Sequence, residues 1–241
     1  MADSPLRGQV SLVTGASQGI GRAVALRLAQ LGSSVVCTAR SEARLAELAA
    51  DIERGGGQAR AVAADIRSES AVAALVQATL QAFGRLDILV NNAGIGQFGQ
   101  PLHETSPAAW AATMETNLRG VYLAIREVAP LLIQRRGGHI INIASLAAHN
   151  PLPGGAAYAA SKAGLHGLSI SVAEELRGYG IRVALICPGS VDTDLSPGLV
   201  GNKDRARMLR PEDVAHAVET LVTQAPQSFI SEVQIRPTLK P

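Results

Sequence analysis

The sequence predicts an α/β fold in which a doubly wound parallel sheet of about seven strands is flanked by helices. Short runs of branched apolar residues alternate with longer helical stretches, and glycine or proline separates them. The short runs are continuously apolar, which is typical of strands that helices cover on both faces. The seven expected strands are residues 10–14, 34–38, 60–63, 88–91, 139–143, 182–187 and 232–235.

Helices are expected between these strands because the intervening segments are rich in Ala, Leu, Glu and Gln. Gly32 follows the first of them, and Pro107 and Pro211 open two later ones. Alternation of strand and helix from end to end places a ligand beyond the carboxyl ends of the strands, near a topological switch point. The expected helices are residues 21–31, 42–54, 68–83, 107–134, 156–179 and 211–223.

Length and charge restrict the class of protein. The 241 residues, 47% of them hydrophobic, are enough for one domain spanning 1–241. A formal net charge of +2 with dispersed basic residues argues against nucleic acid or an anionic membrane as a partner. The sequence has no leader-like start and no apolar run long enough for a bilayer, so a cytoplasmic protein is expected. Residues 189–210 are long and polar enough to form a substrate lid.

The cysteines and histidines do not predict a metal site. Cys37 and Cys187 fall in expected strands, so we interpret them as buried, reduced residues that form no disulfide. The histidines lack metal-ligand spacing and have no cysteine cluster to join. They are His103, His139, His149, His166 and His216.

A glycine-rich turn, residues 14–21, follows the first expected strand. Gly15, Gly19 and Gly21 permit a tight turn and close backbone approach, and the next helix offers its N-terminal amides to a pyrophosphate. The spacing differs from the common dinucleotide fingerprint, and a glycine-rich turn also arises for structural reasons. We expect the turn to bind the phosphates of a coenzyme.

The end of the second expected strand indicates which coenzyme. An acidic residue there would bind a free ribose 2′-hydroxyl, but Ala39 and Arg40 stand in its place. A guanidinium matches phosphate oxygens, so NADP(H) is favoured and NAD(H) or mixed use is the alternative. Asp65, after the third strand, is positioned to accept a hydrogen bond from the adenine amino group, although it equally fits a helix N-cap.

Tyr158 and Lys162 predict an enzyme. A spacing of four residues puts the phenol and the ammonium on one face of a helix. A nearby cation favours phenolate, so we expect the pKa of Tyr158 to fall toward neutral pH and allow proton exchange with a substrate oxygen.

Taken together, these motifs resemble the short-chain dehydrogenase/reductase family over nearly the whole chain. The resemblance includes Thr14-Gly15 to Gly21, Asn91-Asn92-Ala93-Gly94, Pro188-Gly189-Ser190 with Thr193, and a tetrad. It implies a Rossmann-like fold and catalytic residues Asn117, Ser145, Tyr158 and Lys162. The coenzyme contacts that follow from motifs and resemblance are Gly15, Ser17, Gln18, Gly19, Ile20, Gly21, Arg40, Asp65, Ile66, Asn91, Ala93, Gly94, Tyr158, Lys162, Pro188, Gly189, Val191 and Thr193.

The resemblance also implies a mechanism of carbonyl reduction. Reduced nicotinamide delivers hydride to the carbonyl carbon, Tyr158 donates a proton to the oxygen and Ser145 holds that oxygen by a hydrogen bond. Lys162 lowers the pKa of Tyr158 and holds the nicotinamide ribose, and Asn117 fixes a water that links Lys162 to solvent. A non-catalytic coenzyme-binding regulator is an alternative, but the intact tetrad argues against it.

The substrate is expected to be a medium-sized ketone or aldehyde, or the corresponding alcohol in the reverse reaction. Ser145 and Tyr158 are expected to contact it, and the pocket wall is expected to include the residues Ile95, Phe98, His149 and Leu152.

The pattern also resembles 3-oxoacyl-acyl-carrier-protein reductases, so acyl carrier protein is an alternative partner. Lys203, Arg205, Arg207 and Arg210 would dock an acidic carrier. The segment 229–238 departs from the usual end of those reductases, and Pro130 and Glu174 stand where docking bases are expected. A general carbonyl reductase is therefore preferred. The resemblance further implies a homo-oligomer, a tetramer or dimer, in which the helices near 107–134 and 156–179 pair.

Overall fold

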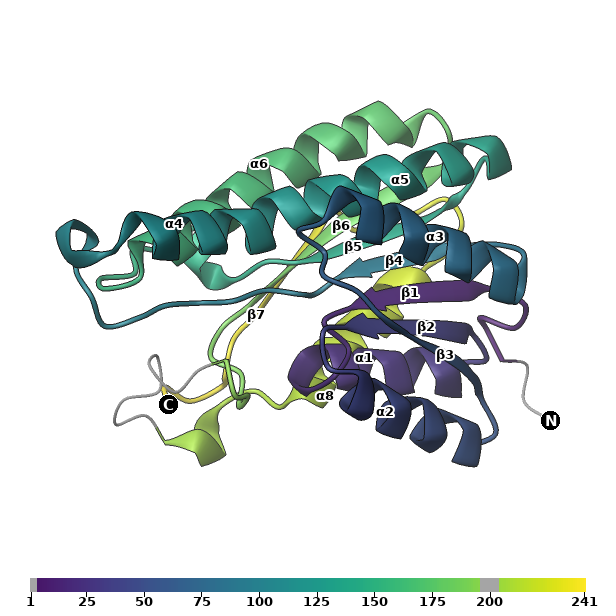
Figure 1. The fold of residues 1–241 in the computed structure, drawn as a ribbon, viewed down its shortest axis with the longest axis horizontal. Helices are drawn as coiled ribbons and strands as arrows, with labels where there is room; N and C mark the ends of the chain where they lie inside the picture. The colour runs from purple at the N-terminus through teal and green to yellow at the C-terminus, as the bar shows by residue number, and fades with distance from the viewer. Residues whose placement is uncertain (1–3, 196–203) are drawn as a thin grey trace.

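A computed structural model describes residues 4–195 and 204–241 and has a central parallel sheet between two layers of helices (Figure 1). The strands lie in the order β3-β2-β1-β4-β5-β6-β7, and each neighbouring pair is parallel. The predicted fold class is therefore confirmed. The strands are β1 (Val10–Thr14), β2 (Ser34–Ala39), β3 (Gln58–Ala63), β4 (Ile88–Asn91), β5 (Gly138–Ile143), β6 (Ile181–Pro188) and β7 (Glu232–Ile235).

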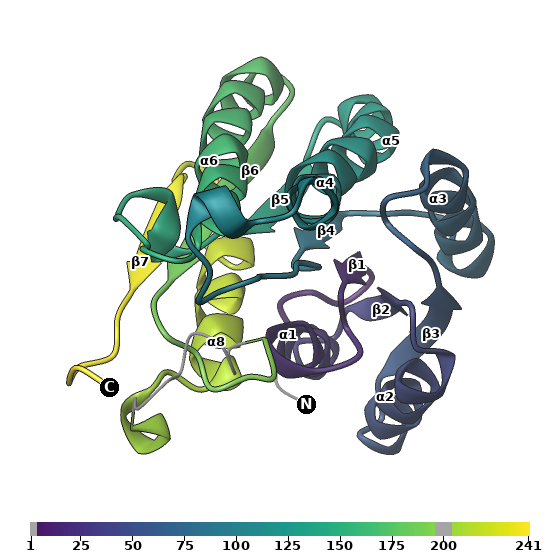
Figure 2. The same cartoon turned by 60° about the vertical axis from the view of Figure 1, so that its left-hand side comes forward.

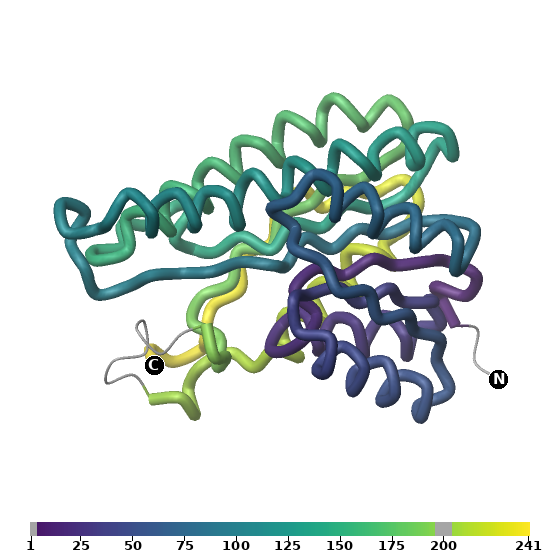
Figure 3. The backbone as a smooth tube through the Cα atoms, in the orientation of Figure 1, coloured from purple at the N-terminus to yellow at the C-terminus, as the bar shows by residue number. Residues whose placement is uncertain are grey.

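The helices form one layer on each face of the sheet (Figure 2), and the backbone trace in Figure 3 has the same two helical layers. One layer holds α1 (Gly19–Gln30), α2 (Glu42–Arg54) and α8 (Pro211–Val222). The other holds α3 (Glu69–Phe83), α4 (Pro107–Met114), α5 (Gly120–Arg135) and α6 (Ala156–Arg177). A buried apolar cluster fills the space under each layer, which explains why the central strands are apolar on both faces. None of the helices in the described ranges combines the length and apolar character needed to cross a bilayer.

Burial of the strands follows their position in the sheet. Every residue of β1 and β4, at the centre, is buried, whereas β3 at one edge and β7 at the other are partly exposed. β3 begins at Gln58, two residues before the prediction, because Gln58 still pairs with Ser34 of β2. The strand order reverses between β1 and β4, so the predicted switch point lies where β1 and β4 end.

The expected helix 107–134 is not a regular α-helix. Five residues, Glu115–Arg119, form a π-helical segment (η2) between α4 and α5. A π-helical turn inserts a residue into the helical register and is frequent at functional sites. Here it contains Asn117, whose side chain is completely buried. Three short 3-10 helices also lie in expected loops: η1 (Leu102–Glu104), η3 (Leu146–Ala148) and η4 (Arg205–Arg207).

The expected lid, 189–210, is described only in part, because residues 196–203, and with them Lys203, lie outside the described ranges. A parallel bridge joins Val191 to Leu209 across this interval. Arg205 pairs with Asp192 at 3.0 Å. The described ends of the segment are therefore held together near the end of β6.

A buried carboxylate, Asp87, connects three elements on the side of the sheet opposite the switch-point crevice. Its side chain accepts a hydrogen bond of 2.9 Å from the backbone amide of Val10 and two of 2.8 Å from Arg85. Arg135, at the end of α5, lies 3.0 Å from the same carboxylate. Asp87 thus ties the start of β1 to β4 and α5.

We expect Asp87→Ala to lower the free energy of unfolding by about 3 kcal/mol, because it leaves the Val10 amide and two guanidinium groups without their acceptor. Urea denaturation measures the loss. The matched control is Glu174→Ala, which breaks an exposed pair with Arg177 and should cost far less, since exposed pairs are screened. Equal losses in the two variants would contradict this role of Asp87.

Candidate active site

The glycine-rich turn after β1 has a backbone that only glycine fits at two positions. Gly15 has φ +65°, and a Cβ there would lie 2.7 Å from Ala93 Cα. A Cβ on Gly21 would lie 2.3 Å from the Gly15 carbonyl oxygen. α1 then begins at Gly19 with no side-chain cap at Gln18 and no acidic residue in its first turn. Its N-terminal amides and positive dipole end therefore suit an anion such as a pyrophosphate.

Hydrogen bonds of Asn92 and Thr14 connect this turn to the loop after β4. The Thr14 hydroxyl accepts hydrogen bonds from the amides of Asn92 (3.0 Å) and Ala93 (3.1 Å). The side-chain amide of Asn92 donates hydrogen bonds to the backbone carbonyls of Thr14 (3.0 Å) and Gly15 (3.2 Å). The two loops therefore form one rigid wall at the switch point.

Asn91, expected among the coenzyme contacts, directs its side chain into the core. Its amide donates to Asn142 Oδ1 at 2.8 Å, and Asn142 donates to Ser169 at 2.8 Å. This buried chain of hydrogen bonds joins β4, β5 and α6. Asn92, one residue later, lines the cleft in its place.

The coenzyme cleft carries more positive charge than the sequence analysis expected. Arg40 lines it as predicted, but Arg44 and Arg67 line it as well. Arg67 binds Asp65 through two guanidinium nitrogens at 2.6–3.0 Å, and this hydrogen bonding lowers the pKa of Asp65. Arg44 donates to the Gln18 side chain at the entrance to α1. The lining also contains the predicted residues Gly15, Ser17, Gln18, Gly19, Ile20, Asp65, Ile66, Ala93, Gly94 and Thr193.

Sequence reasoning missed Arg44 and Arg67 because neither belongs to a motif. The available signal was their position: each lies shortly after the carboxyl end of a strand, β2 or β3, that borders the cleft.

Tyr158 and Lys162 lie together on the inner face of α6, both almost fully buried. Lys162 Nζ is 5.7 Å from the centre of the Tyr158 ring and donates a hydrogen bond of 2.8 Å to the Ile143 carbonyl at the end of β5. A Cβ added at Gly94 would lie 3.3 Å from Asn117 Oδ1 and 3.7 Å from Nζ, so the backbone at Gly94 passes close to both side chains.

The expected lowering of the Tyr158 pKa is wrong for this structure. Burial raises the pKa of Tyr158 to about 12, although a hydrogen bond with Ser145 opposes the shift. Burial also lowers the pKa of Lys162 to about 8. The reason is that both groups lose water on burial, and this loss outweighs the opposing hydrogen bond.

Asn117 binds the backbone of the segment that follows β4. Its side-chain oxygen accepts from the Ile95 amide at 2.8 Å, and its amide donates to the Ile95 carbonyl at 2.8 Å and to Ser161 at 3.0 Å. Both amide hydrogens of Asn117 are therefore used by protein acceptors. The π-helical segment aims this side chain at Ile95 and so positions one wall of the cleft.

A second cavity, of about 510 Å³, adjoins the coenzyme cleft. Ser145, Tyr158 and Lys162 line it together, and the hydroxyl of Ser145 accepts a hydrogen bond from the Ala147 amide at 3.1 Å. The two cavities share the residues Ile20, Asn92, Gly94, Thr193 and Leu195. The predicted nicotinamide-loop residues Pro188, Gly189, Val191 and Thr193 and the predicted substrate contact Leu152 also line it.

The carboxyl end of the chain forms part of this wall, which the sequence did not predict. Arg236, Pro237, Leu239 and Lys240 line the cavity. The unusual sequence after β7 indicated different packing, but no pattern indicated that it faces the substrate.

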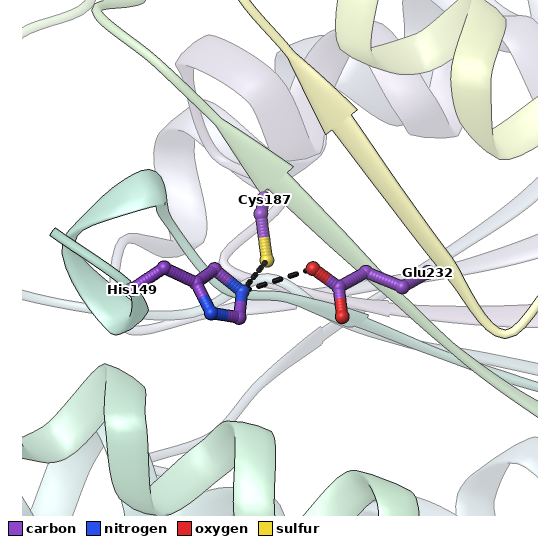
Figure 4. A group of neighbouring side chains, drawn as sticks. All are labelled: His149, Cys187 and Glu232. Carbon is purple, nitrogen blue, oxygen red and sulfur yellow. Dashed lines mark hydrogen bonds and ion pairs between the residues drawn. The ribbon is translucent and has the colours of Figure 1, made fainter.

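The remaining expected substrate contacts do not line this cavity. Ile95 lines the coenzyme cleft. Phe98 packs edge-on against Tyr158, with ring centres 5.1 Å apart, and so contacts the phenol ring directly. His149 points instead toward Cys187 and Glu232 (Figure 4).

His149, Cys187 and Glu232 bring together three possible metal-ligand atoms, all within 4.8 Å of one another. The sequence analysis predicted no metal site because these residues are far apart in the chain. Only the pairing of β6 with β7 and the loop after β5 bring them together.

The comparisons with known proteins agree with this geometry. The sequence model of the short chain dehydrogenase family matches residues 9–203 of this chain. A 3-oxoacyl-[acyl-carrier-protein] reductase of Synechocystis is 39% identical over 232 residues, 94% of each chain.

Two solved structures have the same fold over nearly the whole chain. A metagenomic short-chain oxidoreductase in complex with NADP is 49% identical, with a TM-score of 0.87 and coverage of 98% of this chain and 100% of that one. A 3-ketoacyl-(acyl-carrier-protein) reductase from Brucella melitensis complexed with NADH is 34% identical, with a TM-score of 0.90 and coverage of 97% and 98%. The chain therefore belongs to the short-chain dehydrogenase/reductase family of oxidoreductases, which act on CH–OH and C=O groups.

Proposed function

We propose that the protein is an NADP(H)-dependent reductase that converts a ketone or aldehyde into an alcohol, with Tyr158 as the proton donor. One observation carries the proposal: the buried Tyr158 and Lys162 line, with Ser145, a cavity that adjoins the glycine-walled cleft. The same groups serve the reverse reaction, alcohol oxidation, when the coenzyme ratio favours it.

Tyr158 and Ser145 have separate roles in the proposed reaction. The bound reduced coenzyme supplies a hydride to the carbonyl carbon. Tyr158 donates its proton to the carbonyl oxygen, and the raised pKa keeps this hydroxyl protonated at neutral pH. Ser145 donates a hydrogen bond to the same oxygen as negative charge develops there.

Lys162 supports Tyr158 after the proton leaves. With a pKa of about 8 it stays largely charged at neutral pH, and its ammonium stabilises the phenolate that remains. It also binds the nicotinamide ribose. Asn117 holds a water that returns a proton toward Lys162. Because both side-chain amide hydrogens of Asn117 bind protein acceptors, this water would donate a hydrogen bond to an oxygen of Asn117.

The preference for NADP(H) rests on the charge of the cleft. Ala39 leaves no carboxylate at the end of β2, and Arg40 lines the cleft beside it as the proposed partner of a 2′-phosphate. Arg44 and Arg67 also line the cleft, but Arg44 donates to Gln18 and Arg67 pairs with Asp65. The structure that is 49% identical is described with NADP, and the one that is 34% identical with NADH.

The substrate is proposed to be a medium-sized carbonyl compound. Leu146, Leu152, Met208 and Leu239 make much of the cavity wall apolar, and Ser145 and Tyr158 supply the polar contacts.

A 3-oxoacyl group on acyl carrier protein is the second candidate substrate, supported by the Synechocystis relative. Two of the expected docking bases are partly neutralised, since Arg205 pairs with Asp192 and Arg207 with Asp204. Lys203 lies outside the described residues. These pairs favour the free carbonyl substrate.

A homo-oligomer, dimer or tetramer, is part of the proposal. Exposed apolar side chains on the outer faces of α5 and α6, Tyr122 and Ile170, support pairing of these helices between subunits.

Tyr158→Phe should lower turnover by about 10²- to 10⁴-fold, because it removes the proton donor, while NADPH affinity changes little. The measurement is NADPH oxidation with a panel of ketones and a 3-oxoacyl carrier protein. Tyr179→Phe, at an exposed position just after α6, is the matched control and should keep full activity. Undiminished turnover by Tyr158→Phe refutes the donor role, and no turnover by the unaltered protein favours a regulator.

Arg40→Ala should raise KM for NADPH by about 10- to 100-fold, since a hydrogen bond to a charged group contributes about 1.5–3 kcal/mol. KM for NADH should change little, because NADH lacks the 2′-phosphate. Arg54→Ala, at the exposed end of α2, is the control. An unchanged KM for NADPH would assign the phosphate to Arg44 and Arg67 instead.

The buried Lys162 predicts an unusual dependence of stability on pH. Between pH 8 and the ordinary value of 10.5 the unfolded chain holds a proton on Lys162 that the folded protein has released. The free energy of unfolding should therefore rise across this range, by an amount on the order of 3 kcal/mol.

Lys162→Met should lose this rise, and with it the catalytic activity. The measurement is urea denaturation of both proteins from pH 7 to 10.5 without coenzyme, compared as a difference so that other titrating groups cancel. A constant difference across this range would show that burial does not lower the pKa of Lys162.

A further inference from the structure

Four side chains from four elements meet beside the proposed active site. His149 follows η3, His166 lies on α6, Cys187 is the last residue but one of β6, and Glu232 opens β7. His149 and His166 pack edge to face with ring centres 4.7 Å apart. No step of the proposed mechanism uses these groups, so their convergence needs another explanation.

The distances suit a small tetrahedral cation. His149 Nε2 lies 2.9 Å from Glu232 Oε1 and 3.7 Å from Cys187 Sγ. Zinc bond lengths of about 2.0–2.3 Å place the ligand atoms of a tetrahedral site about 3.3–3.6 Å apart. The two distances from His149 differ from these values by a few tenths of an ångström, and the third pair, Cys187 and Glu232, lies within 4.8 Å (Figure 4). Small side-chain movements would therefore bring these three atoms around one ion.

The second histidine orients the carboxylate. His166 Nε2 lies 3.1 Å from Glu232 Oε2, the oxygen that does not face His149. Such an outer partner fixes the direction of a metal-binding carboxylate. About a quarter of each of the His149 and Glu232 side chains is exposed, at 29% and 27%, so an ion can enter from solvent.

We propose that His149, Cys187 and Glu232 bind one divalent transition-metal ion of the zinc type, with His166 positioning Glu232. Thiolate, imidazole and carboxylate together select Zn²⁺ or Co²⁺ over Mg²⁺ and Ca²⁺, which require oxygen ligands. Binding forms a metal–sulfur bond and releases the Cys187 proton to the buffer, one proton for each ion. Three protein ligands leave one coordination position for water.

The ion would connect the cluster to the cavity. Cys187 directly precedes Pro188 and Gly189, and His149 follows Leu146 and Ala147, all of which line the cavity. A metal at the cluster would therefore hold the loop after β5 against β6 and β7. This inference does not depend on the identity of the coenzyme or the substrate.

The test is titration of the purified full-length protein with CoCl₂ and ZnCl₂. Co²⁺ should produce a thiolate-to-cobalt charge-transfer band and tetrahedral d–d bands, and Zn²⁺ should abolish them. Calorimetry with Zn²⁺ in two buffers of different ionisation enthalpy should give one binding site and one released proton for each ion. MgCl₂ should give no binding.

Cys187→Ala should lose the charge-transfer band and weaken Zn²⁺ binding by at least about tenfold, and His166→Ala should weaken it by about tenfold. Cys37→Ala changes the other cysteine of the chain, which is buried in β2, and is the matched control that should bind like the unaltered protein. His103→Ala and His216→Ala, on exposed histidines, should also bind normally.

Thermal unfolding without metal checks that each variant folds. Should Cys187→Ala not fold, Glu232→Gln decides the question, because it removes the charge of a partly exposed side chain and preserves its shape. Absence of the cobalt thiolate band, Zn²⁺ binding that survives both Cys187→Ala and Glu232→Gln, or loss of binding in His103→Ala or His216→Ala overturns the proposal.

Discussion

A buried ammonium without a carboxylate partner is the constraint around which this structure is organised. Lys162 has only the Ile143 carbonyl as a close hydrogen-bond acceptor among the described residues, and burial lowers its pKa to about 8. Such a cation costs stability while nothing negative lies next to it. In the proposed reaction the same cation would stabilise the phenolate that remains when Tyr158 has donated its proton. The buried ammonium therefore lowers the free energy of unfolding at the place where the proposed reaction needs a positive charge.

The surrounding elements keep this charge in place through hydrogen bonds that reach across the sheet. Asn117 binds the backbone of Ile95. Hydrogen bonds between Thr14 and Asn92 join the turns after β1 and β4. Asn91 is connected through Asn142 to α6. Buried amides have little freedom once all their partners are satisfied. These hydrogen bonds tie the loops at the switch point to the neighbouring elements, and hydride transfer between two bound molecules needs such fixed positions.

The cluster at His149 lies where the loop after β5 meets β6 and β7. Cys187 and Pro188 are neighbours in the chain, yet one side chain faces the cluster and the other lines the cavity. An ion at the cluster would act on the cavity wall through the backbone and not through contact with the substrate. The fold would then hold a binding site for chemistry and a separate site that restrains the wall of the first.

The sequence by itself determined the parallel sheet, the glycine turn and the pairing of Tyr158 with Lys162, because strand hydrophobicity, positive-φ glycines and i,i+4 spacing are local properties. It did not determine the direction of the Tyr158 pKa shift, the inward turn of Asn91, the arginines at 44 and 67, or the position of the C-terminal residues on the cavity wall. It also did not reveal that His149, Cys187 and Glu232 meet. Each of these depends on how deeply a group is buried and on which distant segment lies next to it, and only the packing of the helices and the order of the strands decide that.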